Sequence, residues 1–197
     1  MDARYLQATT VLPNQDKVCG RTLRAFCLRH RVALEAIGSP FLNPMGKTFR
    51  PIDVVLAVRI MSTYDKEKMT DRLSLLDKLH LMLLNCSRKR LAYSIGRIIG
   101  CIQLSCSYPK LWKKENKEGQ INSEKMPMPL ACIANLMRNG VSLEEAWTMP
   151  EGEAVWMSIA HAIYEGAKVD ILSTDEEKEL EKFGDRIDAY KKRMNHN

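Results

Sequence analysis

The stretch LAYSIGRIIGCIQL, residues 91–104, is the most apolar part of this 197-residue chain, and it decides which kind of fold the chain can have. Its apolar residues recur every three to four positions, which is the period of an α-helix. They are Leu91, Ile95, Ile98, Ile99 and Ile102. Arg97 and Gln103 interrupt the run, which is shorter than the roughly 18 residues that a membrane span needs. We therefore expect the central helix of a soluble bundle here.

The same stretch carries a narrow strip of small residues. Ala92, Gly96 and Gly100 fall four positions apart, so they lie on one side of the predicted helix. Small residues allow another backbone to approach closely. A glycine inside a helix costs about 1 kcal/mol relative to alanine, so we expect tight packing along this strip to compensate.

The sequence before the central helix predicts three more helices. The first covers about 23–37, where a glycine and a proline follow. The second begins at Pro51, which suits a first helical position. The third is expected to be capped by Thr70 and to carry leucines at helical spacing, and Ser87 is expected to cap the central helix itself.

The sequence after the central helix divides into a polar stretch and a second helical region. Residues 108–129 are charged and bracketed by prolines, which predicts a linker or mobile loop. We therefore expect a basic helical region over 1–107, this linker, and a C-terminal helical region over 130–197. The predicted fold class is all-α, a compact multi-helix bundle with a charged linker and a C-terminal amphipathic helix.

The C-terminal region contains two capping boxes, in which a serine and a glutamate three residues later cap a helix reciprocally. They begin at Ser142 and Ser173, and between them a helix is expected from Pro150 to about Lys168. The last helix has apolar residues spaced three and four apart, as in a coiled coil. These are Leu180, Phe183, Ile187, Tyr190 and Met194. This stripe would either dock on the chain's own core or pair with another chain.

Charge is distributed unevenly along the chain. The net charge is +6, with basic residues in excess before residue 126 and acidic residues in excess after it. Such an arrangement favours binding to nucleic acid or to an acidic partner, or head-to-tail attraction between copies. We expect no membrane partner and no export signal, and hence a cytoplasmic protein.

The sequence offers little that resembles catalysis. The six cysteines form no CxxC pair, and we expect reduced thiols with no bound metal. His161 and Glu165 lie one helical turn apart, but no HExxH motif accompanies them. Phosphate-binding and nucleophile motifs are also missing from the sequence. We therefore expect no enzyme, no catalytic residue and no cofactor.

Nucleic-acid binding is an alternative that the basic clusters keep open, because phosphate contacts need such side chains. Acidic residues are mixed among them, however, and no helix-turn-helix is evident. The candidate residues are Arg21, Arg24, Arg29, Arg31, Arg88, Lys89 and Arg90.

Two parts of the chain resemble small proteins encoded among bacteriophage tail genes. The sequence RAFCLRHRVALEAIGSPFL, followed by PIDVVLAVRIMS, resembles the start of such proteins. The later sequence EEAWTMPEGEAVWMSIAHAIYEGAKVDILSTDEEKEL is similar in character to phage tail assembly chaperones. The resemblance touches roughly residues 21–63 and 130–182. It implies a helical protein of the host cytoplasm that coats the tape measure protein and recruits tail tube subunits, and it brings no catalytic residue.

The residues that we expect to contact a partner are apolar or aromatic. Tryptophan is a favoured anchor at interfaces, and methionine suits adaptable surfaces. The predicted contacts are Trp147, Trp156, Leu180, Phe183, Ile187 and Tyr190. The predicted partners are a phage tail or tape measure protein and further copies of this chain. A structural protein of the phage particle and a small basic nucleic-acid-binding protein are the alternatives.

Overall fold

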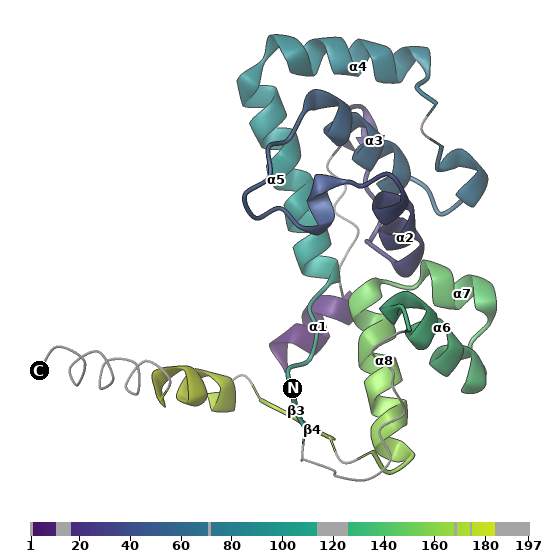
Figure 1. Cartoon of the computed structure of the whole chain (residues 1–197), viewed down its shortest axis with the longest axis vertical. Coiled ribbons are helices and arrows are strands. Elements are labelled where there is room, and N and C mark those ends of the chain that lie inside the picture. Colours follow the sequence, from purple (N-terminus) through teal and green to yellow (C-terminus); the bar gives the residue numbers. More distant parts are fainter. Residues whose placement is uncertain are drawn as a thin grey trace, which may run out of the picture.

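The computed structural model describes residues 2–10, 17–70, 72–113, 126–167, 169–173 and 175–183. These residues are mostly helical, which confirms the predicted all-α, multi-helix fold class. Figure 1 shows two lobes, one above the other, and a helical segment that projects sideways near the C-terminus. None of the described helices is both long enough and apolar enough to cross a membrane.

The first lobe is built around the predicted central helix. Its helices are α2 (Leu28–Ala36), α3 (Pro51–Met61), α4 (Leu75–Cys86) and α5 (Arg88–Ser105). Short 3-10 helices η1 (Pro40–Leu42) and η2 (Lys66–Lys68) and a hairpin of β1 (Lys17–Val18) and β2 (Arg21–Thr22) complete it. Ile98 of α5 is fully buried, and it packs with the apolar face of α3 and with Phe26.

The second lobe contains α6 (Met128–Arg138), α7 (Leu143–Thr148) and α8 (Glu151–Tyr164), and α1 (Ala3–Thr10) packs against α8. Its core joins residues from all three later helices to one residue of α2. These are Leu28, Cys132, Ile133, Leu136, Ala146 and Ala154. The first helix of one lobe therefore supplies part of the core of the other.

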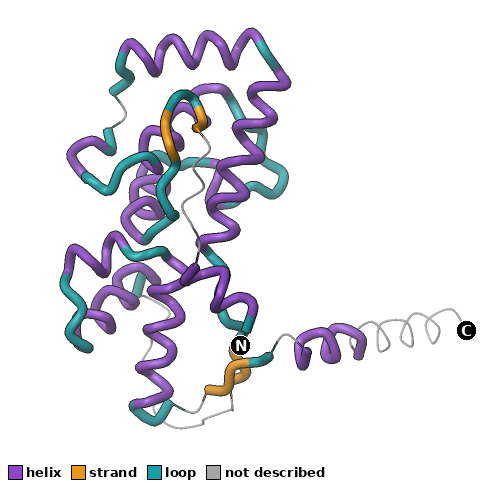
Figure 2. The backbone as a smooth tube through the Cα atoms, turned by 180° about the vertical axis from the view of Figure 1, so that it is seen from behind, coloured by secondary structure: helices purple, strands orange, loops and turns teal. Residues whose placement is uncertain are grey.

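A small sheet precedes the projecting segment. Strands β3 (Leu111–Lys113) and β4 (Val169–Ile171) pair antiparallel, with Trp112 opposite Asp170. The helical segment 175–183 then leads away from both lobes (Figure 2). Ser173 and Glu176 cap this segment reciprocally, as the sequence predicts.

Residues 23–26 are extended, although a helix was expected over 23–37. They lie between the two lobes, and we call this segment the joint. The amide of Arg24 donates to the carbonyl of Met61 (2.8 Å), and the amide of Phe26 donates to Ser105 Oγ (3.0 Å). The carbonyl of Phe26 in turn accepts from the amide of Glu151 (2.8 Å). Backbone groups committed to other elements cannot form a helix, so α2 begins only at Leu28.

A buried carboxylate ties this joint together. The Glu151 side chain is fully buried, and Arg31 Nε donates to both of its oxygens (2.7 Å each). The hydroxyl of Tyr108 also donates to Glu151. Burial alone would lower the pKa of Arg31. The hydrogen bonds to Glu151 and its negative charge outweigh this effect and hold that pKa above its ordinary value. One carboxylate thus joins α2, α8 and the segment that follows α5.

Several predicted boundaries differ from the structure. Ser87 does cap α5, but α4 is capped by Ser74 and not by Thr70, whose hydroxyl accepts from Arg59 instead (3.3 Å). The helix after Pro150 ends at Tyr164, before Lys168, because Gly166 turns the chain with a φ of 93°.

The predicted linker is also partly wrong. Tyr108 bonds to Glu151 and Pro109 is buried. Leu111–Lys113 form β3, and Met128 and Pro129 begin α6. These residues are therefore part of the fold, and residues 114–125 lie outside the described residues. The two helical regions are not separate units, since α1 packs on α8 and Leu28 lies in the second core.

The strip of small residues on α5 is not packed as expected. A methyl group added at Gly96 or Gly100 would meet no described atom within 4 Å. A close approach of backbones occurs instead at Gly152, where an added Cβ would lie 2.7 Å from the carbonyl oxygen of Ser105. The close backbone approach to α5 is therefore made by α8, at its first turn.

Candidate functional site

An open groove lies between α2, the η2 turn and α7, and its volume is about 850 Å³. The three elements come from both lobes, so the groove exists only because the extended joint brings them together. The groove is lined by Arg29, Val32, Ala33, Ala36, Tyr64, Asp65, Lys66, Glu67, Met69, Leu143, Glu144 and Trp147.

The floor of the groove is apolar and accessible. Val32 is 41% exposed and Leu143 is 51% exposed, although both are large aliphatic side chains. Trp147 is half-buried and packs against the second core, while Met69 packs against the first. Accessible apolar surface of this kind, framed by polar residues, is typical of a binding groove.

An ion pair closes one side of the groove and fixes the distance between its walls. Both terminal nitrogens of Arg29 donate to the carboxylate of Glu144, over 2.7 and 2.8 Å. Arg29 also donates to the carbonyl of Tyr64 (2.6 Å), so it joins α2 both to α7 and to the turn that precedes η2. The hydrogen bonds from Arg29 lower the pKa of Glu144 and keep it ionised.

A buried histidine holds the turn that carries Tyr64. The imidazole of His30 stacks on the Tyr64 ring, with 5.4 Å between the centroids. Its Nε2 lies 2.8 Å from the carbonyl of Thr63, and its Nδ1 accepts from the amide of Cys27 (3.4 Å). Burial lowers the pKa of His30 to about 4, so the ring is neutral and its Nε2–H donates to Thr63.

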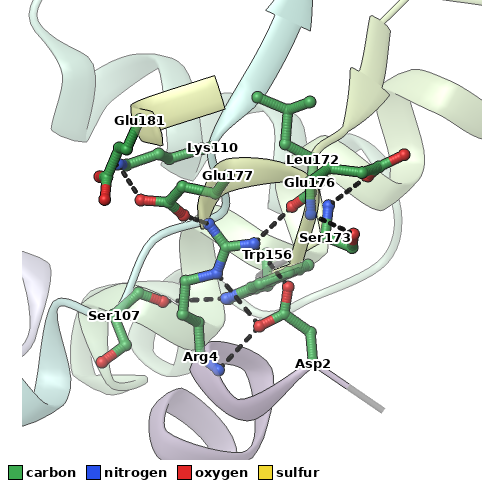
Figure 3. Close-up of polar contacts among 10 residues, drawn as sticks. All are labelled: Asp2, Arg4, Ser107, Lys110, Trp156, Leu172, Ser173, Glu176, Glu177 and Glu181. Carbon is green, nitrogen blue, oxygen red and sulfur yellow. Dashed lines mark hydrogen bonds and ion pairs between the residues drawn. The ribbon is translucent and has the colours of Figure 1, made fainter. Parts of the chain in front are cut away.

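The structure separates the two tryptophans that the sequence suggests as partner contacts. Trp147 lines the groove. Trp156 is only 8% exposed, its Nε1 donates to the carbonyl of Ser107 (2.9 Å, Figure 3), and its ring meets Tyr5 edge-on at 5.6 Å. Trp156 is therefore a packing residue between α8 and α1, and the expectation that it forms an exposed contact is wrong.

The terminal apolar stripe is only partly within the described residues. Leu180 and Phe183 are 43% and 62% exposed on the segment 175–183, so this part of the stripe does not dock on the chain's own core. Ile187 and Tyr190 lie outside the described residues.

Three of the six arginines in the predicted nucleic-acid set are paired with carboxylates of the described chain. Arg21 pairs with Asp77, Arg29 with Glu144 and Arg31 with Glu151. The guanidinium of Arg24 lies over the ring of Tyr64, 5.8 Å from its centroid. Arg88, Lys89 and Arg90, at the start of α5, are exposed.

Of the neighbours His161 and Glu165, only His161 lies on α8. The carboxylate of Glu165 lies 3.3 Å from Arg138, and Glu165 itself follows the end of the helix. Among the described residues, no group of three or more His, Cys, Asp or Glu side chains is arranged to hold a metal ion.

No pattern in the sequence singled out the exposed groove residues Val32 and Leu143, or the exposed surface of α4. On α4, Leu75, Leu76, Leu79 and Met82 are all strongly exposed. The available signal was the lack of a polar face, since residues 75–84 contain only three polar residues.

Comparison with known proteins gives no relative from which a role could be carried over: no protein family, no curated protein and no solved structure matches the chain.

Proposed function

We propose that this protein is a non-enzymatic assembly factor that holds an amphipathic helix of a client protein in the groove between α2, η2 and α7. The observation that carries the proposal is the exposed apolar floor of that groove, with Val32 and Leu143 accessible and Trp147 at its wall. An amphipathic helix places its apolar residues on one side and suits such a groove.

The rim of the groove supports a helical client. It carries both signs of charge, with Lys66 on one side and Asp65 and Glu67 beside it. The polar flanks of an amphipathic helix find partners of either sign there, while its apolar face covers the floor. Since Arg29 and Glu144 already pair with each other, the groove needs no large rearrangement before binding.

The class of client follows from the resemblance to phage tail assembly chaperones, which act on a long helical tape measure protein. We propose this client, several copies acting side by side, and action in the host cytoplasm. Purified phage particles separate this role from that of a structural protein: a chaperone is absent from them, whereas a structural protein is present at a fixed copy number.

The direct test is co-expression with the tape measure protein encoded in the same genome. Wild-type chain should keep that protein soluble and co-purify with it. Val32→Glu combined with Leu143→Glu should reduce the recovered complex about tenfold or more, because both changes place charge on the apolar floor. Met45→Glu is the matched control, since Met45 is 88% exposed and lies outside the groove.

Equal recovery with the groove variant and with Met45→Glu would refute the groove as the client site. The exposed basic cluster Arg88–Arg90 favours nucleic-acid binding as the second candidate function. Salt-dependent binding of DNA, lost on changing these three residues to glutamine and unaffected by the groove variant, would favour nucleic-acid binding instead.

A further inference from the structure

Helix α4 has an apolar surface that nothing in the described chain covers. Leu84 on one side is buried in the first core, and Leu81 packs against it. On the other side, Leu75, Leu76, Leu79 and Met82 are 84%, 48%, 49% and 60% exposed. Positions 75, 79 and 82 are spaced like a helix face, and the exposed Cys86 continues it by one turn. We call Leu75, Leu76, Leu79 and Met82 the α4 face.

The surroundings of the α4 face are basic. Arg72, Lys78, Arg88, Lys89 and Arg90 are all exposed. The one acidic residue from 72 to 90 is Asp77, which is buried and pairs with both Arg21 and Arg59 (2.9 and 2.7 Å). Despite its burial, hydrogen bonds from Ser74, and then from the two arginines, hold the pKa of Asp77 at about 2. Two α4 faces brought together would therefore place like charges side by side, which is unfavourable.

The helical segment 175–183 also has an exposed apolar surface, but the charge around it is negative. Leu180 and Phe183 are exposed on it, and they border a shallow hollow together with Leu172. The segment also holds five acidic residues against two lysines. It thus matches the α4 face in both properties, apolar residues and complementary charge.

The segment is fixed in a projecting position by polar contacts at its first turns (Figure 3). Glu177 accepts from Arg4 of α1 (3.1 Å) and from Lys110, which also lies 3.7 Å from Glu181. Arg4 is held in turn by Asp2 (2.6 Å). Figure 1 places α4 at one end of the molecule and this segment beside the opposite end, so the two surfaces of one chain do not meet.

We propose that the segment 175–183 of one copy docks on the α4 face of the next copy, so that copies associate head to tail. The two surfaces differ, so the interface is heterologous and each added copy leaves one surface of each kind free. This inference extends the proposed side-by-side action of several copies, but the surfaces are separate from the client groove. The two ideas can therefore fail independently.

The test uses two variants of the full chain. The first, Leu79→Glu with Met82→Glu, removes the α4 face, and the second, Leu180→Glu with Phe183→Glu, removes the projecting surface. By sedimentation velocity, the mean mass of the wild-type chain should rise between about 1 µM and about 100 µM, the range expected for a small interface. Each variant alone should stay monomeric, and Met45→Glu should behave like wild type. Circular dichroism checks that every variant is folded.

The deciding experiment mixes the two variants. Each retains the surface that the other lacks, so an equimolar mixture should form one-to-one dimers and nothing larger. The dimer should weaken severalfold as salt is raised, because opposite charges surround the apolar contact. Monomeric wild type at the highest concentration would overturn the proposal. So would a mixture that stays monomeric, or a variant that still dimerises alone through contact between like surfaces. The groove is unchanged in the α4-face variant. Co-purification of the client with this variant therefore tests the groove separately from self-association.

Discussion

At the scale of single residues, His30 shows how a polar side chain positions the groove from within the protein. Its ring is buried, it stacks on Tyr64, and it bonds the backbone of Thr63 and of Cys27. Burial is the main reason why its pKa falls to about 4, and the neighbouring Arg29 lowers it further. The neutral ring is thus part of the folded state.

The consequence is a loss of stability in acid. The pKa of His30 is lower in the folded chain than in the unfolded chain, where it is near 6.5. Its contribution is therefore complete above about pH 6.5 and declines as pH falls towards 4, by at most roughly 3 kcal/mol. Urea unfolding of wild type and His30→Gln between pH 7.5 and pH 4, as an approximate range, should show their stability difference shrinking in acid.

His161→Gln, on α8, controls for the loss of an imidazole elsewhere. A difference between wild type and His30→Gln that stays constant over this pH range would contradict the assignment of a neutral, buried ring.

At the scale of elements, the sequence predicted features that depend on neighbouring residues and not those that depend on residues distant in the chain. The reciprocal caps beginning at Ser173 and the cap at Ser87 were predictable, because each depends on residues within three positions of one another. The extended segment before α2 was not, because its backbone bonds go to Met61, Ser105 and Glu151, which are distant in sequence. For the same reason, the sequence indicated Trp147 as a contact residue but did not predict the groove, whose walls come from elements distant in the chain.

Helix α4 depends on a cap that the sequence analysis placed four residues too early. Ser74 Oγ accepts from the amide of Asp77 (3.2 Å), and its hydroxyl donates to the Asp77 carboxylate (2.7 Å). Ser74→Ala should lower the free energy of unfolding by about 1 kcal/mol, as measured by urea denaturation. Ser74→Thr keeps the hydroxyl and should recover most of that loss. Equal losses in both variants would show that the cap does not stabilise α4.

At the scale of the whole molecule, two lobes share one joint. Leu28 of α2 lies in the core of the second lobe, and the fully buried Glu151 of α8 pairs with the partly buried Arg31 of α2. Buried ion pairs stabilise little on their own, but removing one partner leaves the other charge unpaired. We therefore expect the lobes to unfold together in the wild-type chain.

Glu151→Gln should disturb this joint strongly. Arg31 and the Tyr108 hydroxyl lose a fully buried carboxylate, so the free energy of unfolding should fall by roughly 3 kcal/mol. Tryptophan fluorescence reports mainly on the second lobe, and thiol reactivity of the buried Cys101 reports on the first. The two urea transitions should coincide in wild type and separate in the variant. Glu153→Gln, on the same helix, is the control, and coincident transitions in Glu151→Gln would refute the role of this carboxylate.

The contact between Arg4 and Glu177 links α1 to the projecting helical segment 175–183. Proteolytic trimming that removes Asp2 and Arg4 would therefore release this segment from its polar contacts with α1. Trimming of this kind would change how the segment is presented to a neighbouring copy, and a trimmed preparation would then report on an altered assembly.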